Sequence, residues 1–416
     1  MRAWVLHPDI KSDRQRRHPE HALAEAVALA AALPDVDILG QDVVRLPKML
    51  PGTLFGTGKL AELKAKFAEA DVGLVFIDGP VTPVQQRNLE REWQVKLLDR
   101  TGLILEIFGD RAATREGVLQ VQLAALSYQR TRLVRAWTHL ERQRGATGTV
   151  GGPGETQQET DRRAIDDAVL RIKGSLAKVV KTRALHRAAR RKVPWPVVAL
   201  VGYTNAGKST LFNRLTGAEV LAKDMLFATL DPTMRGILLP SGQKVILSDT
   251  VGFISELPTQ LVAAFRATLE EVLEADLIAH VRDISHPETA EQKADVLDIL
   301  GKLGVDAAVP VIEVWNKLDL VEGAAREGLE MQAARGQGIY PLSALTGAGI
   351  APLIAAIEAQ FAEDTSERSL HLPFADGKRR AWLHGEGVVQ AEAADDSGYL
   401  LSLRWTARQE KRFREL

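Results

Sequence analysis

Hydrophobic and polar positions follow different periods along the chain, and each period predicts a type of element. In residues 1–110, short apolar runs at 3–6 and 72–78 predict strands, and the Ala-rich stretch 21–32 predicts a helix. Thr82 predicts the cap of another helix, which runs through Gln85 and Glu92. Strands that alternate with helices favour a small α/β domain with a mainly parallel sheet.

A Gly-containing turn, residues 56–59, stands before a predicted helix in this first part. The sequence Gly56-Thr57-Gly58-Lys59 has the residue types of a phosphate-binding turn. It lacks the full spacing of such a loop, and no strong strand precedes it. An ordinary loop and helix start is therefore the favoured interpretation.

Residues 111–192 change to a heptad period. One stripe of leucines and a second stripe of apolar residues each predict a long helix with one apolar side. The first stripe comprises positions 119, 126, 133 and 140, joined by 123 and 137, and the second comprises 165, 169, 172, 176 and 179. The Gly-rich stretch 146–154 between them is expected to be non-helical. Together these features predict a long antiparallel helical hairpin with a Gly-rich tip.

A third pattern begins at residue 196, where an apolar run predicts a buried strand that ends at Gly202. The chain then reads Gly202-Tyr203-Thr204-Asn205-Ala206-Gly207-Lys208-Ser209-Thr210 and continues into a predicted helix. Glycine, then Gly-Lys-Ser at the required spacing, between a strand and a helix, is the pattern of a phosphate-binding loop. Backbone N–H groups would surround a phosphate chain, Lys208 would reach the β- and γ-phosphates, and Ser209 would hold Mg²⁺.

Two further strands end in polar motifs that complete a nucleotide site. The strand before Asp249-Thr250-Val251-Gly252 predicts that Asp249 holds Mg²⁺ through water and that the Gly252 amide meets the γ-phosphate. The strand before Asn316-Lys317-Leu318-Asp319 predicts base selection. The Asp319 carboxylate can accept from both N1–H and the exocyclic amine of guanine, and adenine offers neither. A later loop matches the segment whose backbone contacts guanine O6, and it comprises Ser343, Ala344 and Leu345.

Charge is concentrated on the predicted hairpin. Residues 130–192 hold 16 lysines and arginines and six acidic residues, a net +10, although the whole chain carries −1. The charge alone fits nucleic-acid binding and a merely solvated helical face about equally. The glycine tip, which allows close approach to RNA phosphates, favours nucleic-acid binding. The candidate RNA-binding residues are Arg144, Gly148, Thr149, Gly151, Gly152, Gly154, Arg162 and Arg163.

Several sequence segments resemble segments that occur in the same order in the HflX family of ribosome-associated GTPases. They lie at 99–108, 111–117, 119–121, 151–155 and 159–163, and with the nucleotide domain the likeness extends from about residue 50 to 365. The resemblance implies GTP hydrolysis, binding to the large ribosomal subunit and its rRNA, and splitting or rescue of stalled or idle ribosomes. ATP use linked to the N-terminal domain is also known in the family. Family members often carry two glycines where this chain has Gly145-Ala146.

The first switch of the nucleotide domain is expected at residues 227–233. By resemblance to related GTPases with Phe-x-Thr-Leu, Phe227 lies at the nucleotide and Thr229 serves as the catalytic and Mg²⁺-binding threonine, with Thr233 as the alternative. With Lys208 and Gly252, Thr229 completes the predicted catalytic set. Many GTPases carry glutamine after the Asp-x-x-Gly motif, but this chain has Phe253, which cannot hydrogen-bond a water. We therefore expect slow intrinsic turnover, with the attacking water positioned by another group, either the backbone of the switches or a ribosomal element.

Short strands at 371–374, 387–390 and 399–405, with a helix at 379–384, predict a small C-terminal α+β domain that ends in a frayed basic tail. The resulting parts are 1–110 (α/β), 111–192 (hairpin), 193–365 (doubly wound phosphate-loop GTPase) and 366–416 (α+β). The chain has no cysteine, no apolar stretch of membrane-spanning length and no signal-peptide core near Met1. A cytoplasmic monomer that binds GTP, GDP and Mg²⁺ is expected.

Three hypotheses remain open from the residues. The leading one is a GTP-controlled factor that docks its basic hairpin into the large ribosomal subunit. The second is an ATP-driven, helicase-like rRNA remodeller that acts through the N-terminal domain, although residues 1–110 contain no complete ATP motif. The third is a signalling GTPase whose hairpin binds a protein, for which binding would be insensitive to salt, unlike binding to rRNA.

Overall fold

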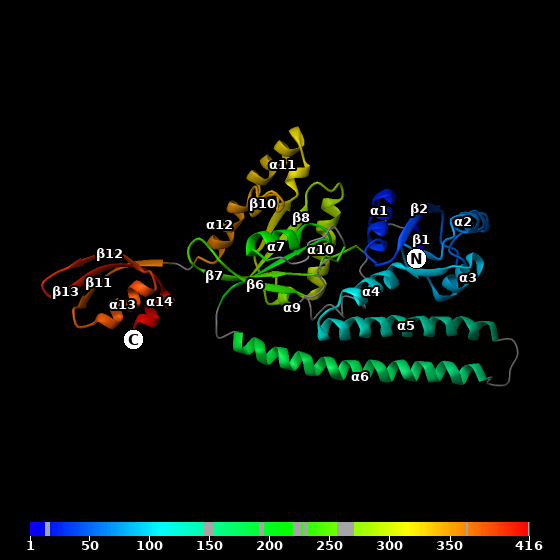
Figure 1. Ribbon diagram of the computed structural model, residues 1–416, viewed down its shortest axis with the longest axis horizontal. Helices are drawn as coiled ribbons and strands as arrows, with labels where there is room; N and C mark the ends of the chain where they lie inside the picture. The colour runs from blue at the N-terminus through cyan, green and yellow to red at the C-terminus, as the bar shows by residue number, and fades with distance from the viewer. Residues whose placement is uncertain are drawn as a thin grey trace. The chain divides into compact units, whose positions relative to one another are not determined.

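The computed structural model describes residues 1–12, 17–144, 153–190, 195–218, 226–227, 232–255, 270–362, 365–414 and 416. The chain divides into two compact units, Met1–Leu353 and Ile354–Leu416. The first unit contains the N-terminal domain, a helical arm and the nucleotide domain, and Figure 1 shows their elements.

The N-terminal domain has a four-stranded, fully parallel sheet in the order β2-β1-β3-β4. Its strands are β1 (Arg2–Ile10), β2 (Asp37–Leu46), β3 (Leu74–Ile77) and β4 (Lys96–Asp99). Its helices are α1 (Pro19–Ala30), α2 (Thr57–Glu69), α3 (Pro83–Trp93) and α4 (Arg100–Arg111). The predicted parallel α/β fold is confirmed, and β2 and β4 are additional strands that the apolar runs did not indicate.

Local capping explains where two of these helices begin. Thr82 and Gln85 form a capping box at the start of α3, with each side chain bonded to the other's backbone N–H. Helix α2 begins at Thr57 after Gly56, which has extended backbone angles, and ten residues separate Thr57 from Leu46, the end of β2. The turn at 56–59 is thus a helix start with no strand leading directly into it.

Two long helices, α5 (Arg115–Arg144) and α6 (Pro153–Arg190), form the arm and run side by side (Figure 1). The second predicted stripe is the less exposed side of α6, with Val169 buried, and an ion pair of 3.0 Å joins Arg130 to Asp166 across the helices. The expectation of a non-helical 146–154 is wrong at its end, because Pro153 and Gly154 open α6. Proline suits the first helical turn, where its missing N–H would have no partner.

The nucleotide domain has a six-stranded sheet in the order β10-β9-β8-β5-β7-β6, in which β6 alone is antiparallel to its neighbour. The strands are β5 (Val197–Gly202), β6 (Thr233–Leu238), β7 (Lys244–Asp249), β8 (Leu277–Asp283), β9 (Val311–Asn316) and β10 (Ile339–Pro341). The helical elements are α7 (Lys208–Thr216), α9 (Glu270–Leu273), α10 (Thr289–Leu303), η1 (Leu318–Leu320), α11 (Gly323–Arg335) and α12 (Ile350–Gln360). This is the doubly wound fold that the motifs predict.

The second unit contains an antiparallel sheet in the order β11-β13-β12, which confirms the small α+β fold. Its elements are β11 (Thr365–Pro373), α13 (Gly377–Gly385), β12 (Val389–Ala394), β13 (Gly398–Thr406) and α14 (Ala407–Arg414). The expected frayed tail is wrong: α14 buries Phe413, whose ring lies 5.4 Å from that of Trp405. Among the described helices, none combines the length and hydropathy that crossing a membrane requires.

Candidate nucleotide-binding site

The predicted nucleotide motifs meet at one edge of the six-stranded sheet. Gly202 ends β5, Asp249 ends β7 and Asn316 ends β9, and these strands are parallel. Their carboxyl ends therefore lie at the same edge, which is where open α/β sheets bind ligands.

Two positions of the phosphate loop accept only glycine. Gly202 has a φ of +154°, and a Cβ there would lie 2.1 Å from the Val281 carbonyl oxygen. Gly207 has a φ of +89°, and a Cβ there would lie 2.2 Å from Nδ2 of Asn316. The loop thus packs directly against β8 and against the base-selecting motif, and a side chain at either glycine would separate them.

Lys208 is buried at the centre of this loop. Its ammonium group donates to the carbonyl oxygens of Gly202 at 3.1 Å and Tyr203 at 2.8 Å. Burial lowers the pKa of Lys208 to about 8, and the nearby Asp249 carboxylate opposes this shift only in part. A phosphate group, which brings negative charge, would restore the preference for the ammonium form.

Ser209 and Asp249 lie together beside the loop. The Ser209 hydroxyl donates to Oδ2 of Asp249 at 2.7 Å, so a hydroxyl and a carboxylate oxygen face the same point. Hard oxygen donors of this kind, completed by water and phosphate, are the ligands that Mg²⁺ prefers. The Ser209–Asp249 pair is therefore the candidate Mg²⁺ site. Among the described residues, no cluster of three or more His, Cys, Asp or Glu side chains suited to a metal occurs.

The base-selecting motif is joined to the phosphate loop by Asn316. Its side chain donates to the Ala206 carbonyl at 2.8 Å and accepts from the Ala344 amide at 2.9 Å. Lys317 has a φ of +64° and forms an ion pair of 2.8 Å with Asp283 at the end of β8. Asp319 is half-buried in η1. Of the remaining loop, Ser343 and Ala344 are buried, and Leu345 is exposed.

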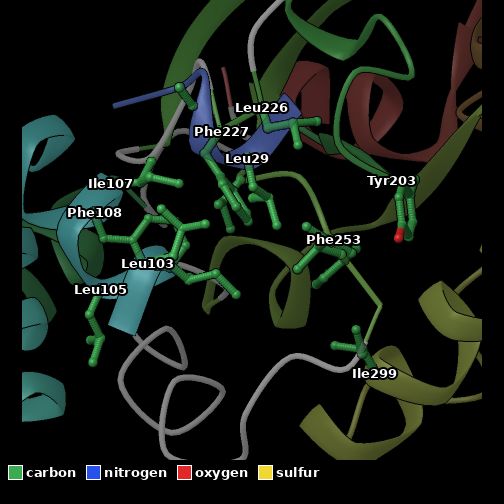
Figure 2. Close-up of a cluster of buried hydrophobic side chains, with 14 of the residues drawn as sticks. Leu29, Leu103, Leu105, Ile107, Phe108, Tyr203, Leu226, Phe227, Phe253 and Ile299 are labelled. Carbon is green, nitrogen blue, oxygen red and sulfur yellow. The ribbon is translucent and has the colours of Figure 1, made fainter. Parts of the chain in front are cut away.

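The predicted residues of the first switch fall partly outside the described chain. Thr229 lies outside it. Thr233 is the first residue of β6 and pairs in register with Asp249. Phe227 has a φ of +57° and turns its ring into an apolar cluster, where it meets Phe108 of α4 edge-on at 4.6 Å (Figure 2). Only the backbone of Phe227 therefore remains to face a nucleotide.

The candidate RNA-binding residues are also only partly described. Gly148, Thr149, Gly151 and Gly152 lie outside the described residues. Arg144 ends α5 and Gly154 lies in the first turn of α6. Arg162 and Arg163 are exposed on α6, one helical turn before Asp166.

Tyr203, the second residue of the phosphate loop, points away from the phosphate site. Its hydroxyl donates to Oε2 of Glu25 in α1 at 2.5 Å and accepts from the Ser255 amide at 2.8 Å. Burial, together with the Glu25 carboxylate, raises the pKa of the Tyr203 phenol, which keeps it protonated. The side chain therefore ties the phosphate loop to the N-terminal domain and to the segment after Gly252.

Arg100, the first residue of α4, completes this buried polar cluster. Its guanidinium donates to Asp78 and to Glu25 at 2.5 Å each and to the Ser255 carbonyl at 3.0 Å. Burial opposes its charge, but the two carboxylates outweigh that cost and raise the pKa of Arg100. Arg17 adds bonds to Glu25 and to Ser255 Oγ. These residues form the Tyr203–Arg100 network, which comprises Arg17, Glu25, Asp78, Arg100, Tyr203 and Ser255.

An apolar cluster lies beside this polar network, at the contact between the N-terminal domain and the nucleotide domain. Leu29 and Leu103 of the N-terminal domain lie in one cluster with Phe227 and Phe253 of the nucleotide domain (Figure 2). Phe253 is 1% exposed, and its backbone bonds to the phosphate loop on both sides, to the Gly202 carbonyl and from the Thr204 amide. The Phe253 side chain is thus a packing group, as its chemistry predicts.

Reasoning from the sequence missed the roles of Glu25, Arg100 and Ser255. All three are distant from Tyr203 in the sequence, so no motif with a fixed spacing connects them to it. The only available signal was that Asp99 and Arg100 begin one of the phrases that resemble the HflX family.

Comparison with known proteins agrees with this geometry. Three families match consecutive stretches: "GTP-binding GTPase N-terminal" over residues 20–109, "GTP-binding GTPase Middle Region" over 111–190 and "50S ribosome-binding GTPase" over 197–317. The GTPase HflX of Magnetococcus marinus is 47% identical over 393 residues, which cover 94% of this chain and 89% of that protein. The GTPase HflX of Escherichia coli is 43% identical over 352 residues, which cover 84% and 81%.

A solved structure shows a weaker likeness. The crystal structure of a GTP-binding protein from Sulfolobus solfataricus in complex with GDP matches 86% of this chain and 98% of its own, with a TM-score of 0.47 and 22% identity. The sequence identity to the bacterial relatives, over most of the length of each protein, carries the assignment. The chain belongs to the HflX family of GTPases and is a GTP hydrolase.

Proposed function

We propose that this GTPase binds the large ribosomal subunit through the arm α5–α6 and, under control of its nucleotide, splits or rescues stalled or idle ribosomes. Two features support the ribosomal partner. The family that matches residues 197–317 is described as a 50S ribosome-binding GTPase. The arm carries the +10 charge of residues 130–192, which suits a polyanion such as rRNA.

The observation that carries the proposal is the position of α4 between the nucleotide and the arm. Its first residue, Arg100, holds the Ser255 carbonyl of the second switch segment (residues 249–255). Near its end, Phe108 packs against Phe227 of the first switch segment (residues 227–233). Helix α5 of the arm begins at Arg115, four residues after α4 ends. A movement of either switch segment would therefore act on the helix that leads into the arm.

The nucleotide site would work through the groups described above. The loop amides and Lys208 would hold the phosphates, and Asp319 would accept from guanine. Ser209 and Asp249 would hold a Mg²⁺ ion, and we propose Thr229 as a further ligand. Bound Mg²⁺ would offset the phosphate charge and orient the γ-phosphate. The Gly252 amide would meet that phosphate and thereby fix the second switch segment.

The cycle follows from differential binding. GTP would stabilise one arrangement of the switch segments because its γ-phosphate contacts both, and hydrolysis would remove that contact. Arg100 and Phe108 would transmit the change to α4 and the arm. We further propose that the protein acts as a cytoplasmic monomer, in keeping with a ribosomal partner.

Cosedimentation with purified large subunits tests the proposal. The assay compares a non-hydrolysable GTP analogue, GDP and no nucleotide, for the full chain and for a variant that lacks residues 145–155. We expect more pelleting with the GTP analogue, loss of pelleting in the tip variant, and steep weakening with salt. Equal pelleting in all three nucleotide states would contradict nucleotide control, and salt-insensitive binding would contradict rRNA contact.

Two double variants that each lose two positive charges test whether ribosome binding depends on the arm or only on the overall charge of the protein. Arg162→Gln with Arg163→Gln removes two exposed charges from α6. Lys302→Gln with Arg326→Gln removes two exposed charges from α10 and α11. Weaker ribosome binding only in the first double variant is the expected result. Equal weakening in both would indicate unspecific attraction.

ATP-driven rRNA remodelling through the N-terminal domain is the alternative, and it makes a distinct prediction. ATP turnover would then survive Lys208→Ala, which removes the ammonium group from the phosphate loop. Outside residues 13–16, which the structure does not describe, the N-terminal domain presents only the helix start at Thr57 as a phosphate-binding candidate. We therefore expect ATP and GTP turnover to be lost together in this variant.

A further inference from the structure

GTP hydrolysis requires a group that hydrogen-bonds the attacking water. In many GTPases that group is a glutamine directly after the Asp-x-x-Gly motif, but here this position is Phe253. The Phe253 ring lies in the apolar cluster between the two domains and has no polar atom to offer. A hydrogen-bonding group must then come from another part of the site. Its signature would be a buried polar atom near the γ-phosphate position that lacks a partner in the protein.

Thr204 has that signature. It is the third residue of the phosphate loop and is only 6% exposed, yet its Oγ1 has no hydrogen-bond partner among the described residues. Burial of an unsatisfied hydroxyl costs about 1–3 kcal/mol. The neighbouring Thr250 is equally buried, but its hydroxyl donates to the Leu200 carbonyl at 2.7 Å. The missing partner thus distinguishes Thr204 from the neighbouring Thr250.

The position of Thr204 is fixed against the second switch segment. Its amide donates to the Phe253 carbonyl at 2.7 Å. A Cβ built on Gly252 would lie 2.8 Å from Cγ2 of Thr204 and 3.0 Å from Nζ of Lys208. The Thr204 side chain, the Lys208 ammonium and Gly252 thus meet within one small volume, next to the groups that would bind the γ-phosphate.

We propose that Thr204 is a catalytic residue of this GTPase, whose hydroxyl hydrogen-bonds the water that attacks the γ-phosphate. A bound triphosphate would place its γ-phosphate at Lys208 and Gly252, beside the Thr204 side chain. The water oxygen then bonds to the γ-phosphorus, the bond from that phosphorus to the bridging oxygen breaks, and GDP leaves with the electron pair. Both water protons finish on inorganic phosphate, and Thr204 orients the water without exchanging a proton.

Two substitutions separate the hydroxyl from the shape of the side chain. Thr204→Val keeps the shape and removes the hydroxyl, and Thr204→Ser keeps the hydroxyl. We expect single-turnover hydrolysis to fall by about 100-fold in Thr204→Val, the size found for loss of one preorganised hydrogen bond in other enzymes. Thr204→Ser should stay within a few-fold of the unmodified chain. Thr216→Val removes a hydroxyl that bonds the Phe212 carbonyl in α7, and it should leave the rate unchanged.

GDP affinity and thermal stability distinguish a catalytic from a structural hydroxyl. GDP has no γ-phosphate, so Thr204→Val should bind it as tightly as the unmodified chain. Because the hydroxyl has no partner among the described residues, its removal should leave the nucleotide-free melting temperature unchanged or raise it. The proposal is overturned if hydrolysis in Thr204→Val proceeds at the normal rate, or if GDP affinity or the melting temperature falls with the rate. Each outcome is independent of ribosome binding.

Discussion

Replacing Tyr203 by phenylalanine removes one hydroxyl from the contact between the phosphate loop and the N-terminal domain. The hydroxyl donates to the Glu25 carboxylate and accepts from the Ser255 amide. Glu25 keeps its bonds to Arg17 and Arg100, so its charge stays satisfied. The Ser255 amide, on a residue only 4% exposed, loses its partner.

The magnitude follows from these two bonds. A hydrogen bond to a charged group contributes about 1.5–3 kcal/mol, and an unsatisfied buried amide costs about 1–3 kcal/mol. The two terms overlap in one hydroxyl, so we expect the free energy that opens this contact to fall by about 2–4 kcal/mol. At about 1.4 kcal/mol per factor of ten, the opening equilibrium should rise about 30- to 700-fold.

Hydrogen exchange followed by mass spectrometry measures this change locally. The peptide that contains Ser255 should exchange faster in Tyr203→Phe by that factor, whereas peptides of β9 should not change. A local probe is needed because a chain of several domains does not unfold in a single step. Tyr340→Phe is the matched control, since the Tyr340 hydroxyl has no hydrogen bond in the described part of the chain. Exchange at Ser255 within threefold of the unmodified chain would refute the reasoning.

Three further predictions concern the nucleotide itself. Burial lowers the pKa of Lys208 to about 8, and a bound phosphate would favour the ammonium form again, so GDP binding should take up a proton above pH 8 and weaken as the pH rises toward 10. Calorimetry at pH 9 in buffers of different ionisation enthalpy should detect this proton uptake, and its absence would contradict the lowered pKa. Gly207→Ala should weaken GDP binding by about 10- to 100-fold, because its Cβ would displace Asn316 and strain the loop; unchanged affinity for a fluorescent GDP would contradict this. Asp319→Ala should reduce the preference for GDP over ADP by about 100-fold or more in a competition assay, and an unaltered preference would contradict the role of its carboxylate.

Much of the nucleotide site was predictable because its motifs are local. The loop at 202–210 lies between β5 and α7, and Asp249 and Asn316 end strands that their own apolar runs indicate. The structure brings these motifs to one sheet edge, since parallel strands share their direction. Thr229 and the tip of the arm lie outside the described residues, so their roles stay predictions.

Other elements were not predictable from pattern. Strand β2 is rich in half-exposed residues and contains Gly40 and polar positions, and β4 has only four residues. Neither presents the apolar run that marks a buried strand. The pattern of residues 411–414 predicts a charged, frayed end, but Phe413 packs against Trp405 in a buried apolar cluster. Burial of the ring stabilises the helix.

The sequence by itself determined where positive charge gathers, and it predicted which residues would hold phosphate, which oxygens would suit Mg²⁺ and which carboxylate would accept from guanine. These properties depend on residue type at fixed short spacing, so the order of letters is enough to specify them. Only the tertiary structure decided that Glu25 and Arg100 meet Tyr203 and Ser255, and that α4 touches both switch segments. Those contacts join positions more than 100 residues apart. Their pairing depends on how two domains pack, which no local pattern encodes.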